Sequence, residues 1–84
     1  MSEQDSDQII PECRLDTTGL VCPVPILMAK KKLAAMAAGS TLEILATDPA
    51  APQDIAAFCK ATGNALVDSG RRGETSWFLV RRRT

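Results

Sequence analysis

The stretch Gly19-Leu20-Val21-Cys22-Pro23-Val24-Pro25 lies between a short apolar segment and a long helical pattern, and it decides how the chain folds. Proline is favoured in the first turn of a helix, where its missing N–H costs nothing. Pro25 is therefore predicted to lie at the start of a helix that runs to about Ala38, and Gly39 is a stop signal for it. Before the stretch, Cys13–Asp16 is predicted to form a short strand.

The rest of the chain is predicted to continue the alternation of strand and helix and to end in a β-hairpin. Hydrophobic periodicity and turn residues predict a strand over 41–47, a helix over about 51–62, a strand over 65–68, a turn at 70–73 and a strand over 75–82. The order is βαβαββ, which predicts an α/β two-layer sandwich with two helices packed on one face of a four-stranded mixed sheet. The first two strands should be parallel and the last two antiparallel. The helical residues expected to face the sheet are Ile26, Ala29, Leu33 and Met36, then Ile55, Phe58, Cys59 and Thr62.

Length and composition restrict the class of protein. Eighty-four residues suffice for one small domain, expected over 11–84 after a flexible acidic tail at 1–10. Ten basic and ten acidic residues cancel, which argues against broad binding to a phosphate backbone. The chain has no His, which removes imidazole metal sites and Cys-His pairs, and neither a metal nor a cofactor is expected. No apolar run reaches the length of a membrane span and no signal peptide is visible, so a cytoplasmic location is expected.

The three cysteines are expected to be free thiols with different environments. Their odd number cannot form a complete disulfide framework, and no CxxC spacing exists. Cys59 falls on the apolar side of the second predicted helix, where core packing is expected. Cys13 lies in or before an edge strand and is expected to have no role, although a resolving partner for Cys22 stays open at this point.

Cys22 is the candidate catalytic residue. It stands directly before a predicted helix N-terminus, whose N–H groups and dipole favour negative charge, so its pKa is expected to be lowered. Gly19 permits a tight turn before it, and Pro23 and Pro25 restrict the backbone after it. No general base is evident, which argues against hydrolytic covalent catalysis. A thiolate of this kind can attack sulfur electrophiles, or hold a sulfur atom and pass it on.

The pattern Leu15-Asp16-x-x-Gly19-Leu20-x-Cys22-Pro23-x-Pro25 resembles the signature of the TusA-like, or SirA-like, sulfur-carrier family, with its Cys-Pro-x-Pro motif. The resemblance runs from about Cys13 to Arg83. Further matches are Thr47-Asp48-Pro49, Asp54-Ile55, Phe58-Cys59 and Phe78-Leu79-Val80-Arg81.

The resemblance implies the βαβαββ fold and a sulfur-carrier function. In this family the motif cysteine, here Cys22, accepts a persulfide sulfur from a cysteine desulfurase or rhodanese-type donor and passes it to an acceptor protein. The destinations in the family are 2-thiouridine in tRNA, cofactor assembly and sulfur oxidation. Pro23 and Pro25 position the cysteine. Such a protein is a sulfurtransferase-type carrier rather than a stand-alone enzyme, and it is expected to be a monomer.

Val24, Asp48 and Lys31 are the candidate residues for docking to these partners. Asp48 matches a family acidic residue near the partner-binding surface, and its alternative role is that of a helix cap. Lys30-Lys31-Lys32 either forms a solvated helix face or docks to an acidic partner. Val21 stands where the family frequently has Arg or Lys, which removes one positive charge that would favour the thiolate.

The alternative is a regulatory or RNA- or protein-binding module of the same fold that transfers no sulfur. In that case the Arg81-Arg82-Arg83 run contacts the partner and Cys22 is incidental. The paucity of aromatic residues argues against direct nucleic-acid binding. The two hypotheses differ in whether function survives the loss of the Cys22 thiol.

Overall fold

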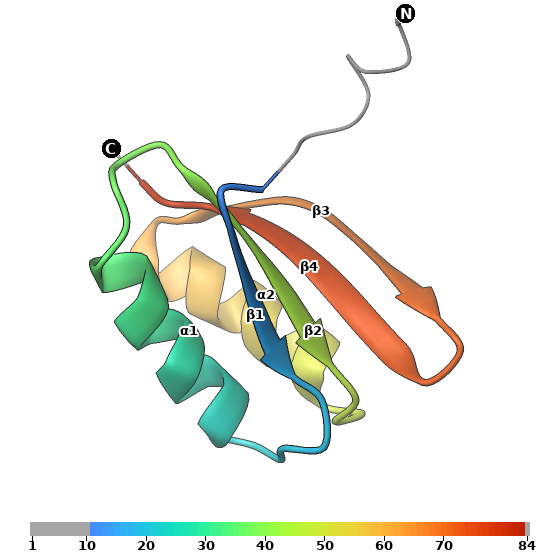
Figure 1. The fold of residues 1–84 in the computed structure, drawn as a ribbon. Coiled ribbons are helices and arrows are strands. Elements are labelled where there is room, and N and C mark those ends of the chain that lie inside the picture. Colours follow the sequence, from blue (N-terminus) through green and yellow to red (C-terminus); the bar gives the residue numbers. More distant parts are fainter. Residues whose placement is uncertain (1–10, 84) are drawn as a thin grey trace, which may run out of the picture.

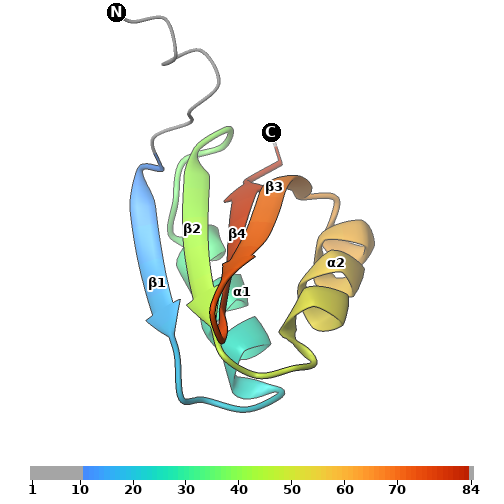
Figure 2. The ribbon, with the colours of Figure 1, turned by 90° about the vertical axis from the view of Figure 1, so that its right-hand side faces the viewer.

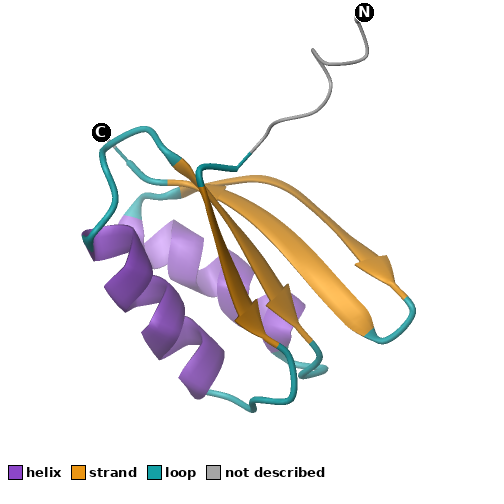
Figure 3. Ribbon diagram, viewed as in Figure 1, coloured by secondary structure: helices purple, strands orange, loops and turns teal. Residues whose placement is uncertain are grey.

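The computed structural model describes residues 11–83, and their secondary structure follows the predicted order. The elements are β1 (Cys13–Thr17), α1 (Val24–Ala34), β2 (Thr41–Ala46), α2 (Ala51–Thr62), β3 (Ala65–Arg72) and β4 (Thr75–Arg81). The strands lie in the order β1-β2-β4-β3, in which β1 and β2 are parallel and β4 is antiparallel to both of its neighbours. Both helices cover one face of the sheet (Figure 1; Figure 3). The predicted two-layer α/β fold is thus confirmed, and the expected acidic tail at 1–10 lies outside the described residues.

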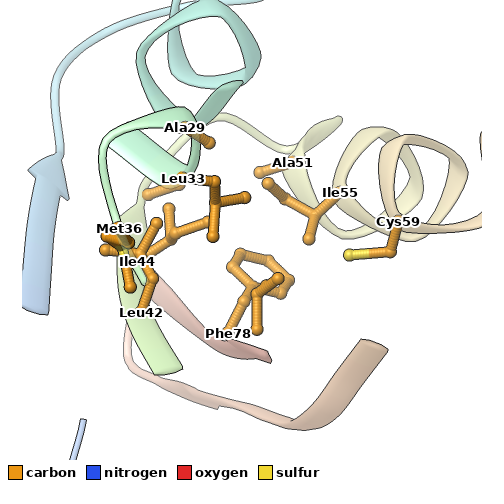
Figure 4. Packing of buried hydrophobic residues seen from close by; sticks show 11 residues of the cluster. Ala29, Leu33, Met36, Leu42, Ile44, Ala51, Ile55, Cys59 and Phe78 are labelled. Atoms are coloured by element: carbon orange, nitrogen blue, oxygen red, sulfur yellow. The ribbon is translucent and has the colours of Figure 1, made fainter. Parts of the chain in front are cut away.

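The core lies between the helices and the covered face of the sheet (Figure 4). Helix residues three or four positions apart share one face, and alternate strand residues share one face. The predicted helical core positions Ala29, Leu33, Met36, Ile55 and Cys59 are buried, whereas Ile26 and Phe58 are only partly buried and pack against the cluster. The sheet contributes Leu42, Ile44, Ala46, Phe78 and Val80.

Helix α1 ends earlier than the sequence predicts. It stops at Ala34 rather than near Ala38, and the next two amides donate to carbonyls three residues back, Ala35 to Lys32 and Met36 to Leu33. Sheet pairing explains the early end, because the Gly39 amide donates to the Arg82 carbonyl at 2.9 Å. The chain must leave the helix in time to reach that partner, and this outweighs the helix propensity of its alanines.

Strand β3 is longer than the sequence predicts, and the hairpin turn lies further along the chain. The strand continues to Arg72, and the turn falls at 73–74 instead of 70–73, with Gly73 at a φ of +61°. Gly70 pairs with Trp77 across the strands, and a Cβ at Gly70 would come within 2.5 Å of the Trp77 ring. The glycine that suggested a turn instead makes room for an aromatic side chain on the neighbouring strand.

The parallel pairing of β1 and β2 determines where the loop that contains Cys22 lies. Both strands end at the same edge of the sheet, so the loops that lead into α1 and α2 lie side by side there (Figure 1; Figure 2). The β3–β4 hairpin turns at this edge as well, because β4 is antiparallel to β2. Neither helix in the described part of the chain has the length and apolar character needed to cross a membrane.

Candidate functional site

Two hydrogen bonds tie the β1–α1 loop to the β2–α2 loop. The Gly19 amide donates to the Thr47 hydroxyl at 2.8 Å, and the Cys22 amide donates to Asp48 Oδ2 at 2.6 Å. Asp48 Oδ1 also accepts from the Ala50 amide at 3.1 Å. Gly19 has a φ of +82°, which side-chain-bearing residues rarely adopt, so the turn before Cys22 depends on glycine at this position.

Cys22 is exposed and lies on a short turn that leads directly into α1. The Cys22–Pro23 peptide bond is cis, and Pro23 is the N-cap residue of the helix. The Pro23 carbonyl accepts the first helical hydrogen bond, from the Leu27 amide at 3.1 Å. Pro25 is buried in the first turn, while Val24 beside it is exposed. The prolines and the Asp48 contact therefore fix the backbone on both sides of the thiol.

The pKa of Cys22 depends on a carboxylate that the sequence analysis did not assign to the site. This carboxylate belongs to Asp54, a half-buried residue in the first turn of α2. Asp54 has the largest effect on the pKa of Cys22 and raises it above its ordinary value, and partial burial and the negative charge of Asp48 raise it further. The expected lowering of this pKa is therefore wrong.

The helix N-terminus does not reverse this effect because few of its N–H groups are free. The first four amides of a helix lack partners within it. In α1 two of these four positions are Pro23 and Pro25, which carry no N–H, and the Val24 amide donates to the Val21 carbonyl at 2.9 Å. The prolines that restrict the backbone beside Cys22 thus also remove backbone N–H donors that would stabilise a thiolate.

Apolar side chains surround the turn. The exposed fractions are 36% for Leu20, 66% for Val21, 38% for Val24 and 58% for Leu27. These four residues, the apolar rim, flank Cys22 in the sequence or lie on the first turn of α1. A cluster of exposed aliphatic residues beside a reactive group is typical of a protein-docking surface.

A polar hollow of about 340 Å³ lies beside Asp48, along the β2–α2 loop. Its walls come from the start of α2 and from the β3–β4 hairpin, and its lining residues are Thr47, Asp48, Pro49, Pro52, Arg71, Glu74 and Ser76. Cys22 does not line it. The exposed thiol of Cys22 lies outside this hollow.

Some of the other predicted site residues lie beside Cys22, and the others lie elsewhere on the molecule. Val24 and Asp48 lie beside Cys22, but Lys31 lies about 10 Å further along α1 and lines an apolar groove with Leu15. Asp48 is not the N-cap of α2, because Ala50 holds that position and no side chain caps it. Arg81 ends β4 and pairs with Thr41 at the opposite edge of the sheet.

Neither of the other two cysteines reaches Cys22. Cys13 begins β1, about 13 Å along the strand from its end at Thr17, and Cys59 is 3% exposed in the core. All three cysteines are free thiols. The possibility of a resolving cysteine, left open by the sequence, is thus not supported by this arrangement.

Asp54 could have been found from the topology. In α/β sheets the functional residues gather where the strands end and the following helices begin. The parallel pairing of the first two strands brings the first turn of α2, which contains Asp54, to the edge that carries Cys22. An acidic residue in that turn is therefore a candidate neighbour of the thiol.

The Asp48 contact predicts a local effect of substitution. Asp48→Ala should lower the free energy of unfolding by about 1 kcal/mol, because the amides of Cys22 and Ala50 lose their acceptor. It should also speed hydrogen exchange at the Cys22 amide, measured by NMR or mass spectrometry. Asp48→Asn, which keeps an acceptor oxygen, is the matched control and should change both less. Unchanged exchange at Cys22 in Asp48→Ala would show that this bond does not hold the turn.

Comparisons with known proteins give the family. The family model described as Sulfurtransferase TusA matches residues 14–82. The chain belongs to the TusA family. A sulfur carrier protein TusA from Allochromatium vinosum is 48% identical over 68 residues, which cover 81% of this chain and 90% of that protein. A putative sulfur carrier protein of Neisseria meningitidis serogroup A is 55% identical over 58 residues, covering 69% of this chain and 78% of the relative.

The fold of this TusA-family chain also matches a solved structure. The crystal structure of a SirA-like protein from Desulfitobacterium hafniense superposes with a TM-score of 0.75 and covers 86% of this chain and 99% of that one, at 22% identity. The resemblance stated from the sequence is confirmed, and so is the function predicted with it: the protein is a sulfur carrier that acts in a relay.

Proposed function

We propose that Cys22 is the residue on which this carrier holds its sulfur, as a persulfide. The observation that carries the proposal is the placement of the three thiols. Cys22 is exposed on a turn fixed by two prolines and by Asp48, whereas Cys59 is buried and Cys13 lies at the opposite end of its strand. A carrier needs one accessible thiol at a surface that other proteins can reach, and only Cys22 meets that condition.

The proposed step is a transfer between two thiols with no net oxidation. Cys22 Sγ attacks the terminal sulfur of a persulfide on the donor, a new Sγ–S bond forms, and the donor's S–S bond breaks. The donor sulfur leaves as a thiolate and takes up the proton that Cys22 gives up. One thiol and one persulfide are present before and after the step. Delivery to the acceptor repeats it, with the acceptor thiol attacking the outer sulfur on Cys22.

The proposed partners are proteins at both steps. The donor is a cysteine desulfurase or a rhodanese-type protein, and the acceptor is a protein with a reactive thiol. The apolar rim and the exposure of Cys22 support a protein as the partner. The carrier works as a monomer in the cytoplasm, a compartment in which its three free thiols stay reduced.

The test is to locate the sulfur after loading. The wild-type protein is incubated with sodium polysulfide, and separately with a cysteine desulfurase and cysteine, and its peptides are examined by mass spectrometry. We expect one added sulfur atom on the Cys22 peptide, removed by a reductant, and none on the peptides of Cys13 and Cys59. Sulfur on another cysteine would overturn the assignment. No sulfur from either source on the folded, reduced protein would also refute Cys22 as the carrier residue.

A further inference from the structure

Two consecutive tight turns, residues 17–24, form the β1–α1 loop that carries Cys22. The backbone hydrogen bonds that close the two turns are 3.1 and 2.9 Å long. Each turn also has one contact with the β2–α2 loop. Thr47 accepts the amide of Gly19 in the first turn, and Asp48 accepts the amide of Cys22 in the second. Two consecutive side chains of the neighbouring loop therefore hold the β1–α1 loop at two separate points.

The two accepting side chains stand on a fixed backbone. Thr47 directly follows Ala46, the fully buried last residue of β2. The Asp48 carbonyl accepts the Ala51 amide at 2.9 Å where α2 begins. Pro49 restricts the backbone of the residue before it. The β2–α2 loop therefore gives both contacts a firm support at the end of the sheet.

The contact of Thr47 has a part that the contact of Asp48 cannot replace. A loop held at Cys22 alone can pivot about that point, whereas a second contact at Gly19 fixes its orientation. Two residues of the apolar rim lie between the two held amides in the sequence. The hydrogen bond to Thr47 thus fixes the place of the rim relative to the thiol.

We propose that Thr47 is a positioning residue for sulfur transfer: its hydroxyl holds Gly19 and thereby fixes the Cys22 thiol relative to the surface on which a protein partner docks. The proposal rests on the proposed function, in which Cys22 carries the sulfur and the apolar rim meets the partner. Thr47 acts through the backbone of the loop rather than on the sulfur.

Positioning matters for a protein partner and not for a small reagent. The donor persulfide is attached to a protein, so the docked surfaces set the direction from which it meets Cys22 Sγ. Attack requires reacting atoms that are close and aligned, and a displacement of about 1 Å can cost about a hundred-fold in rate. A small reagent approaches an exposed thiol in any orientation, and Cys22 is exposed. Loss of the Thr47 contact should therefore slow transfer between proteins and leave small-molecule reactions unchanged.

The test compares Thr47→Val, which removes the hydroxyl at nearly constant size, with Thr47→Ser, which keeps it. Thr62→Val is the matched control, because the Thr62 hydroxyl donates a 2.8 Å hydrogen bond to the Phe58 carbonyl at the far end of α2. Transfer from a loaded cysteine desulfurase is measured over a range of carrier concentrations. We expect kcat to fall about ten-fold in Thr47→Val. Thr47→Ser and Thr62→Val should transfer at close to the wild-type rate.

Three further measurements distinguish positioning from a general loss of structure. KM in Thr47→Val should stay within about two-fold of wild type, because the docking surface itself is unchanged. Alkylation of Cys22 by iodoacetamide and its loading by sodium polysulfide should both proceed at the wild-type rate. Hydrogen exchange at the Gly19 amide should be faster in Thr47→Val than in Thr47→Ser, which verifies that the hydrogen bond is lost.

Several outcomes would overturn the role of Thr47. One is a wild-type kcat in Thr47→Val despite faster exchange at Gly19, and another is a rise in KM at unchanged kcat, which would make Thr47 a docking residue. Slower alkylation in Thr47→Val, or an equal loss of kcat in Thr62→Val, would do the same. Failure of the proposed function shows elsewhere, as wild-type protein that takes up no sulfur on Cys22 from polysulfide. Failure of the positioning role alone leaves that loading intact.

Discussion

Sulfur transfer through this protein is expected to fall to background when Cys22 is replaced by serine. A serine hydroxyl is close in size to the thiol but forms no stable bond to a transferable sulfur atom. Cys22 is exposed and its contact with Asp48 uses the backbone amide, so the substitution should leave the free energy of unfolding within about 0.5 kcal/mol of wild type. Loss of transfer without loss of stability would identify a chemical role.

The measurement is transfer of sulfur from a loaded desulfurase, through the carrier, to an acceptor thiol. Cys13→Ser is the matched control, since it removes a half-buried thiol at the opposite end of β1 and should transfer at close to the wild-type rate. Cys59→Ala provides a second control in the core, and its transfer should be normal once the rate is corrected for folded protein. Transfer that persists in Cys22→Ser and disappears in Cys13→Ser would contradict the assignment.

The sequence predicted the fold because its local signals agree with the tertiary structure. Pro25 lies in the first turn of α1, and Gly63 ends α2 with a φ of +82°. The exceptions are places where sheet pairing prevails over local preference. The helix-forming alanines after Ala34 give way to the pairing of Gly39 with Arg82, and β4 draws the segment around Gly70 into an extended strand. Neither pairing partner can be inferred from the local sequence alone.

The candidate site was predicted less completely than the fold. The position of Cys22 before a helix follows from the sequence around it, and so does the nearness of Asp48, which follows a neighbouring parallel strand. The direction of the shift in the Cys22 pKa does not follow from the local sequence, because its largest cause is Asp54, 32 residues further along the chain. The lowered pKa expected from the helix dipole does not follow either, because two of the first four amide positions of α1 are prolines.

The stability of this scaffold should depend most strongly on Phe78. Its side chain is 2% exposed and lies between the sheet and the helices, close to Ile55 and Leu33 in Figure 4. Phe78 pairs with Ile44 on β2 and with Ser69 on β3. It therefore lies on β4, an interior strand of the sheet. Phe78→Ala should cost about 3–5 kcal/mol, from the lost burial and the cavity that remains.

That loss is large for a chain of 84 residues, whose total stability is expected to be roughly 4–13 kcal/mol. The melting temperature should fall by about 12 °C or more, since 1 kcal/mol corresponds to about 4–8 °C at this size. Circular dichroism gives the unfolding curve, and Trp77, the single tryptophan, gives an independent fluorescence signal. Leu66→Ala is the matched control: Leu66 is 37% exposed on β3 and its truncation should cost less than about 1 kcal/mol. Equal destabilisation by the two substitutions would mean that the buried cluster around Phe78 is not what holds the helices to the sheet.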